Sequence, residues 1–268
     1  MKRRLDGMVV AITGASAGIG RALALELGRR GARLALGARR LDRLEEIDRE
    51  LGGGHLVRTV DVAKREDCEF FVQAALSRFG RLDTLVCNAG YGVARTVAEM
   101  TPVEWQAIFA TNLMGTVDCA RAALPALTTQ ELRDGWRGQV MIVSSCLARR
   151  AGPEGAAYAA TKAAQLSLAE ALRGELREQR VAVTSVHPVG TESEFWQVAE
   201  TQGGRPIVRA VSDPRQTPEQ VAAAMVRAIE RPRPEVWPHA ASRWLFSLAT
   251  LFPGLVDGVV ARRWKRTP

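Results

Sequence analysis

Tyr158 and Lys162 are the residues whose types and spacing best suit proton transfer. They stand four positions apart near the start of a segment with helical period, so we expect their side chains on one face of a helix. An ammonium group beside a phenol favours the phenolate and lowers the phenol pKa from about 10 toward a value useful near neutral pH. Only four of the 37 basic side chains are lysines, which favours a specific need for a compact ammonium here, although a Tyr-x-x-x-Lys string also arises by chance.

Alternating apolar runs and helical segments must position this pair. Strands are expected at about 8–13, 33–38, 56–60, 83–87, 139–144 and 181–186, and helices at about 18–30, 41–51, 65–79, 101–127, 156–179 and 217–230. This alternation predicts an α/β fold, a single Rossmann-type doubly wound parallel sheet with helices on both faces. We expect residues 1–268 to form a single dinucleotide-binding and catalytic domain, with a substrate lid at about 189–216 and an apolar C-terminal tail at about 240–268.

A glycine-rich loop follows the first expected strand and opens the first helix. Its sequence is Thr13-Gly14-Ala15-Ser16-Ala17-Gly18-Ile19-Gly20. The glycines allow a tight turn and close approach of the backbone to a pyrophosphate, while the helix N-terminus offers amide donors. The loop therefore favours a dinucleotide site over an ordinary turn.

The segment after the second strand indicates which dinucleotide binds. An NAD site would place an acid there, against the ribose 2′-hydroxyl. Gly37-Ala38-Arg39-Arg40 has no acid and two arginines, which can pair the additional 2′-phosphate of NADP. Arg39 is the favoured partner because Arg40 can instead begin the exposed face of the next helix; the alternative is that both are surface charges. We expect NADP(H) in preference to NAD(H).

Further motifs follow in a fixed order along the chain. They are Asp61-Val62 after the third strand, Cys87-Asn88-Ala89-Gly90 after the fourth, Thr111-Asn112-Leu113 in the long helix, and Ser145 thirteen residues before Tyr158. With the glycine loop and the Tyr158–Lys162 pair, these motifs resemble the short-chain dehydrogenase/reductase family, in its short single-domain branch, over most of the chain.

The resemblance implies a catalytic tetrad of Asn112, Ser145, Tyr158 and Lys162. Tyr158 would give or take the hydroxyl proton, and Ser145 would hydrogen-bond the substrate oxygen. Lys162 would hold the nicotinamide ribose and depress the Tyr158 pKa, while Asn112 would support a water chain to solvent. Ser144 is the competing serine, but its spacing to Tyr158 is one residue longer and strand alternation points it to the other face. The implied activity is hydride transfer between NADP(H) and a carbonyl or secondary alcohol.

The resemblance also implies which residues bind cofactor and substrate. Besides Tyr158 and Lys162, the cofactor set is Gly14, Ser16, Gly18, Ile19, Gly20, Arg39, Arg40, Asp61, Val62, Asn88, Ala89, Gly90, Pro188, Val189, Gly190, Thr191 and Ser193. The substrate set is Tyr91, Cys146, Leu147, Pro153, Phe195 and Trp196, with Val189 beside them. The chain departs from the family pattern at Cys87, which replaces an asparagine, and at Val189, which replaces a glycine and adds bulk beside the nicotinamide. Ser193 is the expected carboxamide contact, with Thr191 as its rival.

The substrate set is mostly apolar, which favours a lipophilic carbonyl or alcohol and hence a carbonyl reductase. The alternative is that Phe195 and Trp196 only pack the lid onto the core. Another alternative is a catalytically silent NADP(H)-binding regulatory protein, against which the intact tetrad argues. A sugar-nucleotide epimerase or dehydratase on the related extended fold would have a shorter glycine spacing and a larger substrate domain.

Composition indicates whether the chain folds, whether it binds nucleic acid or metal, and in which redox environment it works. The apolar fraction of 47% and the charged fraction of 25% are typical of a folded chain. The net charge of +8 is spread along the chain and interleaved with acids, which favours a solvated basic surface over nucleic-acid binding. Cys68, Cys87, Cys119 and Cys146 are scattered, as are His55, His187 and His239, so we expect a reducing compartment, no metal site, and histidines at the surface or in loops.

Both ends of the chain have apolar segments that need an interpretation. The first 17 residues imitate a signal peptide but serve better as a strand and loop, so we expect an uncleaved, cytoplasmic protein. The apolar run 244–260 is too short to span a bilayer and is broken by Pro253, Gly254 and Asp257. The favoured interpretation buries this run against its own subunit or a neighbour in a homodimer or homotetramer. The alternative places it in a membrane interface, with Trp244 and Trp264 at headgroup depth and the basic end on anionic lipid.

Overall fold

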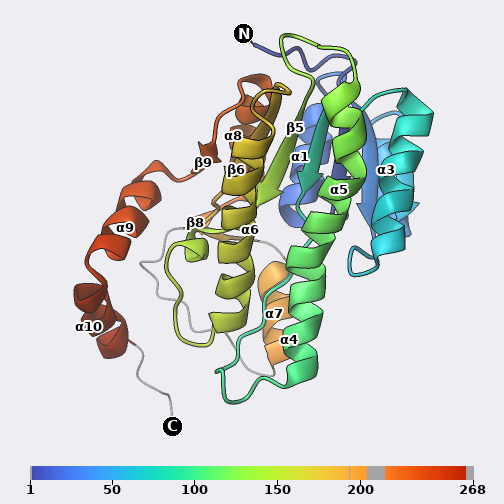
Figure 1. The fold of residues 1–268 in the computed structure, drawn as a ribbon. Helices are drawn as coiled ribbons and strands as arrows, with labels where there is room; N and C mark the ends of the chain where they lie inside the picture. The colour runs from blue at the N-terminus through green and yellow to red at the C-terminus, as the bar shows by residue number, and fades with distance from the viewer. Residues whose placement is uncertain (1, 193, 204–214, 264–268) are drawn as a thin grey trace.

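Seven strands form one parallel sheet at the centre of the molecule (Figure 1). The computed structural model describes residues 2–192, 194–203 and 215–263. The strands lie in the order β3 (Leu56–Thr59), β2 (Arg33–Ala38), β1 (Val9–Thr13), β4 (Thr84–Cys87), β5 (Gly138–Val143), β6 (Val181–Val186) and β9 (Glu235–Val236). The order reverses at β1 and β4, so the carboxyl ends of these strands open the crevice in which such sheets bind ligands. The predicted doubly wound fold is confirmed.

Helices cover both faces of the sheet because its strands are apolar on both sides. Every residue of β1, β4, β5 and β6 is buried, as expected of parallel strands between two helix layers. The core on one face includes α1 (Gly18–Gly28), α2 (Leu41–Glu50) and α8 (Pro218–Glu230). The core on the other face includes α3 (Arg65–Phe79), α5 (Gly115–Thr129) and α6 (Ala156–Glu175).

The helix predicted at 101–127 is divided by a π-helical turn. The helix α4 (Pro102–Phe109) begins with a reciprocal cap between Thr101 and Glu104 and with Pro102 in its first turn. Residues Ala110–Met114 then form the π-helical turn η1 before α5 continues the same rod. Such a turn inserts an extra residue and is frequent at functional sites. Asn112 lies in it.

The chain after β6 is more structured than its sequence pattern indicated. The expected lid contains β7 (Gly190–Thr191), α7 (Phe195–Gly203) and β8 (Arg215–Gln216), with β7 and β8 paired as a separate small sheet. The two-residue strand β9 then adds a seventh member to the main sheet, too short for its periodicity to be recognised. The tail forms α9 (Ala240–Leu251) and α10 (Pro253–Arg263).

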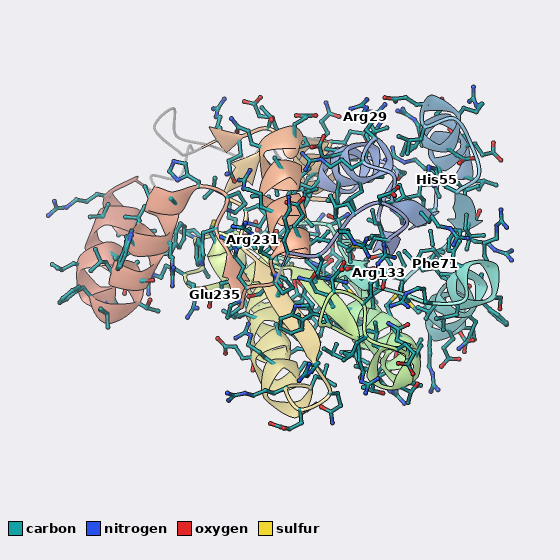
Figure 2. All side chains as sticks on the ribbon, turned by 90° about the horizontal axis from the view of Figure 1, so that it is seen from above. Arg29, His55, Phe71, Arg133, Arg231 and Glu235 are labelled. Atoms are coloured by element: carbon teal, nitrogen blue, oxygen red, sulfur yellow. The ribbon has the colours of Figure 1, made fainter. Side chains whose placement is uncertain are left out.

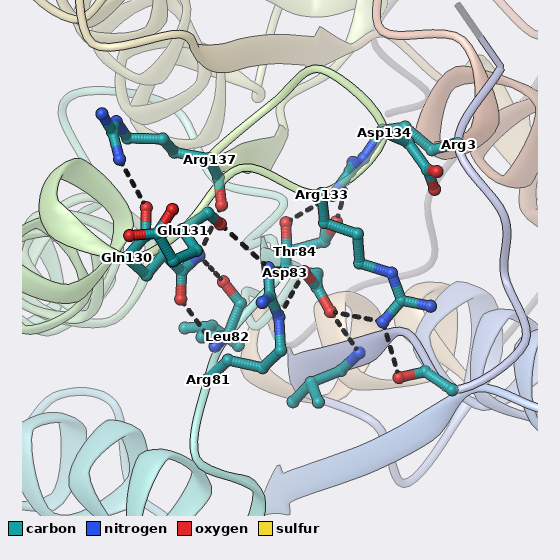
Figure 3. Close-up of polar contacts among 12 residues, drawn as sticks. Arg3, Arg81, Leu82, Asp83, Thr84, Gln130, Glu131, Arg133, Asp134 and Arg137 are labelled. Carbon is teal, nitrogen blue, oxygen red and sulfur yellow. Dashed lines mark hydrogen bonds and ion pairs between the residues drawn. The ribbon is translucent and has the colours of Figure 1, made fainter.

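A polar cluster closes the amino ends of the central strands (Figure 3). The Arg3 guanidinium is buried, and it donates to Gln139 Oε1 at 2.8 Å and to the Asp83 carbonyl at 2.7 Å. The Asp83 carboxylate in turn pairs with Arg81 at 2.8 Å and Arg133 at 3.3 Å. Burial lowers the pKa of Arg3 to about 10. Charge-assisted hydrogen bonds therefore hold the amino ends of the central strands together, while the carboxyl ends of the strands carry the candidate site.

Candidate active site

The first turns of α6 bring Tyr158 and Lys162 together as the sequence predicted. The Lys162 Nζ lies 5.5 Å from the centre of the Tyr158 ring. It donates to the Val143 carbonyl at 2.8 Å and to Gln165 Oε1 at 2.9 Å. Because Lys162 is buried, its pKa is lowered to about 7.

Tyr158 differs from the expectation in the direction of its pKa. Removal of its hydroxyl from water raises the pKa of Tyr158, and a hydrogen bond with Ser145 opposes that rise. Depression of this pKa by Lys162 was predicted, but the ammonium group is turned toward Val143 and Gln165. Desolvation therefore has the larger effect in this structure.

Ser145 is the second residue after β5 and caps the short helix η2 (Cys146–Ala148). Its Oγ accepts a hydrogen bond from the Leu147 amide at 3.1 Å, which fixes the side chain beside Tyr158. The neighbouring Ser144 instead donates to the Lys162 carbonyl at 2.8 Å and ties β5 to α6. The structure thus places Ser145, and not Ser144, next to the phenol.

Asn112 is buried in the π-helical turn with its polar atoms bonded to the protein. Its side chain exchanges two hydrogen bonds with the Tyr91 backbone, at 3.0 and 2.9 Å, and donates to Thr161 Oγ1 at 3.0 Å. Its carbonyl accepts from Thr116 Oγ1 at 2.9 Å and from Gln165 Nε2 at 2.6 Å. The Asn112 carbonyl therefore has two protein donors.

Gln165 links Lys162 of α6 to Asn112 of η1, and its sequence context did not reveal this role. We call the group of buried polar residues around Lys162, Gln165 and Asn112, with the adjoining Tyr158 and Ser145, the corner. It is fully buried, its oxygen accepts from Lys162, and its nitrogen donates both to the Asn112 carbonyl and to Thr116 at 2.8 Å. The available signal was its position three residues after Lys162, which places a polar amide on the same buried face of α6.

His187 lies in the loop after β6, which fits the expectation of surface or loop histidines, but it is not at the surface. Its ring is fully buried between β6 and Trp237, on which it stacks at 4.6 Å. Its Nδ1 lies 3.1 Å from the Ser145 carbonyl, and because a carbonyl only accepts, this nitrogen carries the hydrogen. Burial lowers the pKa of His187, which favours the neutral ring. His187 thus holds the backbone of Ser145, a role that its sequence context did not reveal.

The glycine loop forms the cradle that its sequence predicted. Gly14 has φ of 65°, and a Cβ there would lie 2.8 Å from the Ala89 Cα. A Cβ on Gly20 would collide with the Gly14 carbonyl, so both positions need glycine. Asn88 Nδ2 donates to the Thr13 and Gly14 carbonyls, each at 3.0 Å, and thereby fixes the loop.

The two arginines after β2 are both exposed at the rim of this cradle. Arg40 lies 3.3 Å from Ser16 Oγ in the loop and forms an ion pair at 2.8 Å with Glu194 of the lid segment. Burial raises the pKa of Tyr91, and the positive charge of Arg39 partly opposes that rise. A hollow of about 210 Å³ beside the loop is lined by two other arginines, Arg21 and Arg43, which the sequence motifs did not include.

The remaining cofactor candidates lie at the same edge of the sheet. Ser16, Ala89 and Gly90 border the cradle, and a Cβ on Gly90 would approach Asn112 Oδ1 to 3.0 Å. Asp61 follows β3 and accepts from the Ala63 amide at 3.1 Å, while Val62 packs against Gly115. The set also contains Gly18 and Ile19 at the start of α1 and Pro188, Val189, Gly190 and Thr191 after β6. Ser193 lies outside the described residues.

Val189, the bulky departure after β6, is tied down by the small sheet. Its amide donates to Gln216 Oε1 at 3.2 Å, and its carbonyl accepts from Thr191 Oγ1 at 3.0 Å. The Pro188 carbonyl accepts from the Cys146 amide at 3.0 Å. The loop after β6 is thereby joined to the helix that follows Ser145.

Apolar side chains of the predicted substrate set gather around Tyr158. The Phe195 ring lies 5.3 Å from the Tyr158 ring, and Tyr91 and Tyr158 pack on one small cluster with Val93, Met100 and Ile108. Cys146 is buried, and Leu147 follows it in η2. Pro153 is exposed, and Trp196 lies next to Phe195 in α7. Phe195 therefore brings the lid onto the candidate catalytic phenol.

Comparison with known proteins agrees with this arrangement. The family model described as short chain dehydrogenase matches residues 8–203. An 11-beta-hydroxysteroid dehydrogenase-like protein of Arabidopsis thaliana is 36% identical over 261 residues, covering 94% of this chain and 83% of its own. An alcohol dehydrogenase structure from Thermococcus sibiricus, complexed with 5-hydroxy-NADP, is 31% identical with a TM-score of 0.73, covering 86% of this chain and 95% of its own. A short chain dehydrogenase/reductase structure from Burkholderia phymatum, in complex with NAD, shares the fold at 23% identity with a TM-score of 0.82, covering 94% of this chain and 96% of its own.

Proposed function

This chain belongs to the short-chain dehydrogenase family, and from that premise we propose that it is an NADP(H)-dependent oxidoreductase for lipophilic carbonyls or secondary alcohols. The observation that carries the proposal is the meeting of Ser145, Tyr158 and Lys162 in one corner beside the glycine cradle. A nicotinamide supplies the hydride donor or acceptor when bound. The protein residues supply binding, orientation and proton transfer.

The residues of the cradle fit a dinucleotide. Gly14 and Gly20 let the loop pack closely on Asn88 and Ala89, so the backbone turns tightly into α1. The first amides of α1 have no side-chain cap and can bind phosphate oxygens. The NADP preference rests on two exposed arginines after β2, at positions where an acid would otherwise favour NAD. A guanidinium can bind a 2′-phosphate through two parallel hydrogen bonds.

Each catalytic candidate has a role set by its contacts. Tyr158 gives a proton to the substrate oxygen in reduction and takes it back in oxidation, and Ser145 donates a hydrogen bond to the same oxygen. Lys162 supplies a cation whose buried environment allows it to exchange a proton near neutral pH. Asn112 and Gln165 act as positioning residues, because they hold Tyr91, Thr161 and Lys162 in place.

The apolar surroundings of Tyr158 support a lipophilic substrate. Phe195, Tyr91 and Cys146 surround the phenol with rings and a buried thiol rather than with groups that would bind sugar hydroxyls. Burial raises the pKa of Cys146 to about 11, so this side chain behaves as a small apolar group at neutral pH.

A hydride-transfer assay tests the proposal. Consumption of NADPH and of NADH is followed by absorbance with steroids, quinones, fatty aldehydes and 3-oxoacyl thioesters, and with an open-chain sugar as a polar control. We expect turnover with at least one apolar carbonyl, faster with NADPH than with NADH. Tight NADPH binding without turnover of any carbonyl would support the catalytically silent alternative, and preference for the sugar would overturn the substrate class.

A further inference from the structure

The last two helices form an arm that extends away from the sheet (Figures 1 and 2). We call α9 and α10 together the C-terminal arm (residues 240–263). No single helix in the described part of the chain is long and apolar enough to cross a bilayer, and α9 and α10 meet that criterion only when taken together across a bend of 108°. Since a bilayer core needs about 20 helical residues, helices of 12 and 11 residues are too short to span it separately.

One side of the C-terminal arm is a stripe of large apolar side chains exposed to solvent. Of the 13 large apolar side chains exposed in the described residues, seven lie between positions 244 and 259. The stripe consists of Trp244, Leu245, Leu248, Leu251, Phe252, Leu255 and Val259. Spacings of three and four residues place Trp244, Leu248 and Leu251 on one face of α9, and Leu255 and Val259 on one face of α10. Contiguous exposed apolar surface of this kind marks an interaction site.

The opposite side of the arm is fixed to the body of the protein. Phe246 lies 6.4 Å from the Trp237 ring, Ala249 is buried, and Asp257 pairs with Arg150. These contacts orient the arm and leave the stripe facing outward. In the described residues this run is not buried against its own subunit, so that half of the favoured expectation is wrong, while burial against a neighbouring copy stays a prediction. The stripe is left open to an external partner.

Charge indicates which partner the stripe binds. The sequence from 240 to 268 has five basic residues and one acid, Asp257, which is already paired with Arg150. A two-fold contact between two copies through this segment would bring the same positive segments together. An anionic surface instead offers opposite charge to the basic residues and an apolar layer to the stripe.

We propose that the C-terminal arm binds the surface of an anionic membrane. Both helices lie in the interface plane, the stripe enters the boundary between headgroups and acyl chains, and Arg243 and Arg262 bind lipid phosphates. The bend between α9 and α10 suits two short helices that lie along a surface. This proposal does not depend on the oxidoreductase activity, because it rests only on the apolar stripe and its charge.

Vesicle co-sedimentation with the full chain tests this proposal. Wild-type protein is mixed with phosphatidylcholine vesicles, or with vesicles that also contain phosphatidylserine, at low and high salt. We expect binding to the anionic vesicles, weakened by salt and much lower on phosphatidylcholine alone. Equal binding to both compositions, or no binding to either, would overturn the proposal.

Two double variants and one single variant separate the apolar contribution to vesicle binding from the charged one. Leu248→Ser with Leu255→Ser should weaken binding by about tenfold or more, because two leucines no longer enter the boundary. Arg243→Gln with Arg262→Gln should weaken it by roughly 30-fold at low salt, from about 1 kcal/mol per basic residue. Phe70→Ser is the matched control, because Phe70 is 74% exposed but lies on α3 outside the arm; it should bind as wild type does.

The oligomeric state without lipid decides between a membrane and a second copy. Light scattering on wild-type protein and on the leucine variant should give the same mass. If the leucine variant dissociated an oligomer while vesicle binding remained unchanged, a second copy of the chain would be the partner and the proposal would fail. Unchanged far-ultraviolet circular dichroism shows that each variant is folded.

Discussion

The corner around Lys162 buries polar groups and pairs them by hydrogen bonds, whereas the C-terminal arm leaves apolar groups exposed to water. In the corner, Lys162, Gln165 and Asn112 are buried, and each has at least two hydrogen bonds to other parts of the protein. Among the described residues, the buried side-chain nitrogen or oxygen atoms without a partner all belong to Arg3, Arg149 and Arg150, outside this corner. The arm instead presents apolar side chains to water and has few contacts with the body.

This difference shows which interactions stabilise each region. Polar groups in the corner would be costly if unpaired, so their partners come from strands and helices far apart in the sequence and the corner forms only with the whole fold. The arm consists of two helices of 12 and 11 residues, which are marginal in isolation and depend on a few contacts with the body, such as that of Phe246 with Trp237. Its exposed stripe can be stabilised only by contact with another surface. The variants below test this contrast, beginning with the largest expected effect.

The largest effect is expected from Tyr158→Phe. Loss of the phenol oxygen removes the proton donor from the corner, and kcat should fall by about 10²–10⁴-fold, the usual contribution of general acid–base catalysis. Binding of NADPH, measured by titration calorimetry, should be almost unchanged. A variant that retained near-normal kcat would remove Tyr158 from the mechanism.

A smaller effect is expected for the arginines at the rim of the cradle. Their side chains are exposed like those of the arm, but the 2′-phosphate of NADP is their proposed charge partner. Arg39→Ala should weaken NADPH binding by about 1.5–3 kcal/mol and leave NADH nearly unaffected. Arg40→Ala should have a smaller effect, because Arg40 is already paired with Glu194. Arg49→Ala, exposed at the end of α2, serves as the control for net charge. Wild-type protein with equal affinities for NADH and NADPH would contradict the charge argument.

Lys162 tests the cost of burying a cation in the corner. Its pKa is about 7 in the folded chain against about 10.4 when unfolded, so between these values only the unfolded chain retains the proton. The free energy of unfolding should therefore rise with pH, by about 1.4 kcal/mol per unit from this group. Urea unfolding of cofactor-free protein between pH 7 and pH 8.5 should lose that slope in Lys162→Met and keep it in Lys64→Met, whose side chain is exposed. Parallel slopes in all three proteins would contradict a lowered pKa.

The smallest effect is expected in the arm. Leu255 is 73% exposed, so Leu255→Ser should change the free energy of unfolding by less than about 0.5 kcal/mol in urea. Leu85→Ala, at a fully buried position of β4, should cost about 2–5 kcal/mol and provides the comparison. A cost above about 1 kcal/mol for Leu255→Ser would indicate that the stripe is buried in the free protein.

The fold was predictable wherever a pattern is long enough to repeat. The six long strands and the main helices appeared at their expected places, because buried parallel strands are continuous apolar runs and surface helices have one apolar face. The strand β9 and the π-helical turn were not predictable, since two residues show no period and the turn depends on packing around Asn112.

The candidate site was predictable where motif spacing carries the information. Tyr158 and Lys162 share a helix face, and Ser145 lies two residues beyond the end of β5, so the fold brings them together. Gln165 and His187 were missed because their roles depend on partners that are distant in sequence, such as the Asn112 and Ser145 carbonyls. The direction of the Tyr158 pKa was also missed, because desolvation follows from packing rather than from a motif.

The buried Arg3 has a consequence for how the chain folds during its synthesis. Arg3 is made long before its partners, because its guanidinium donates to Gln139 and to the Ile229 carbonyl, 226 positions later. At about 5–20 residues per second, translation delivers that last partner roughly 11–45 s after Arg3 itself. Until then the cation at the bottom of the sheet stays in water, since burying it without its acceptors is costly. Arg3 thus leaves the ribosome well before its last acceptor and reaches its native place only after α8 has been made.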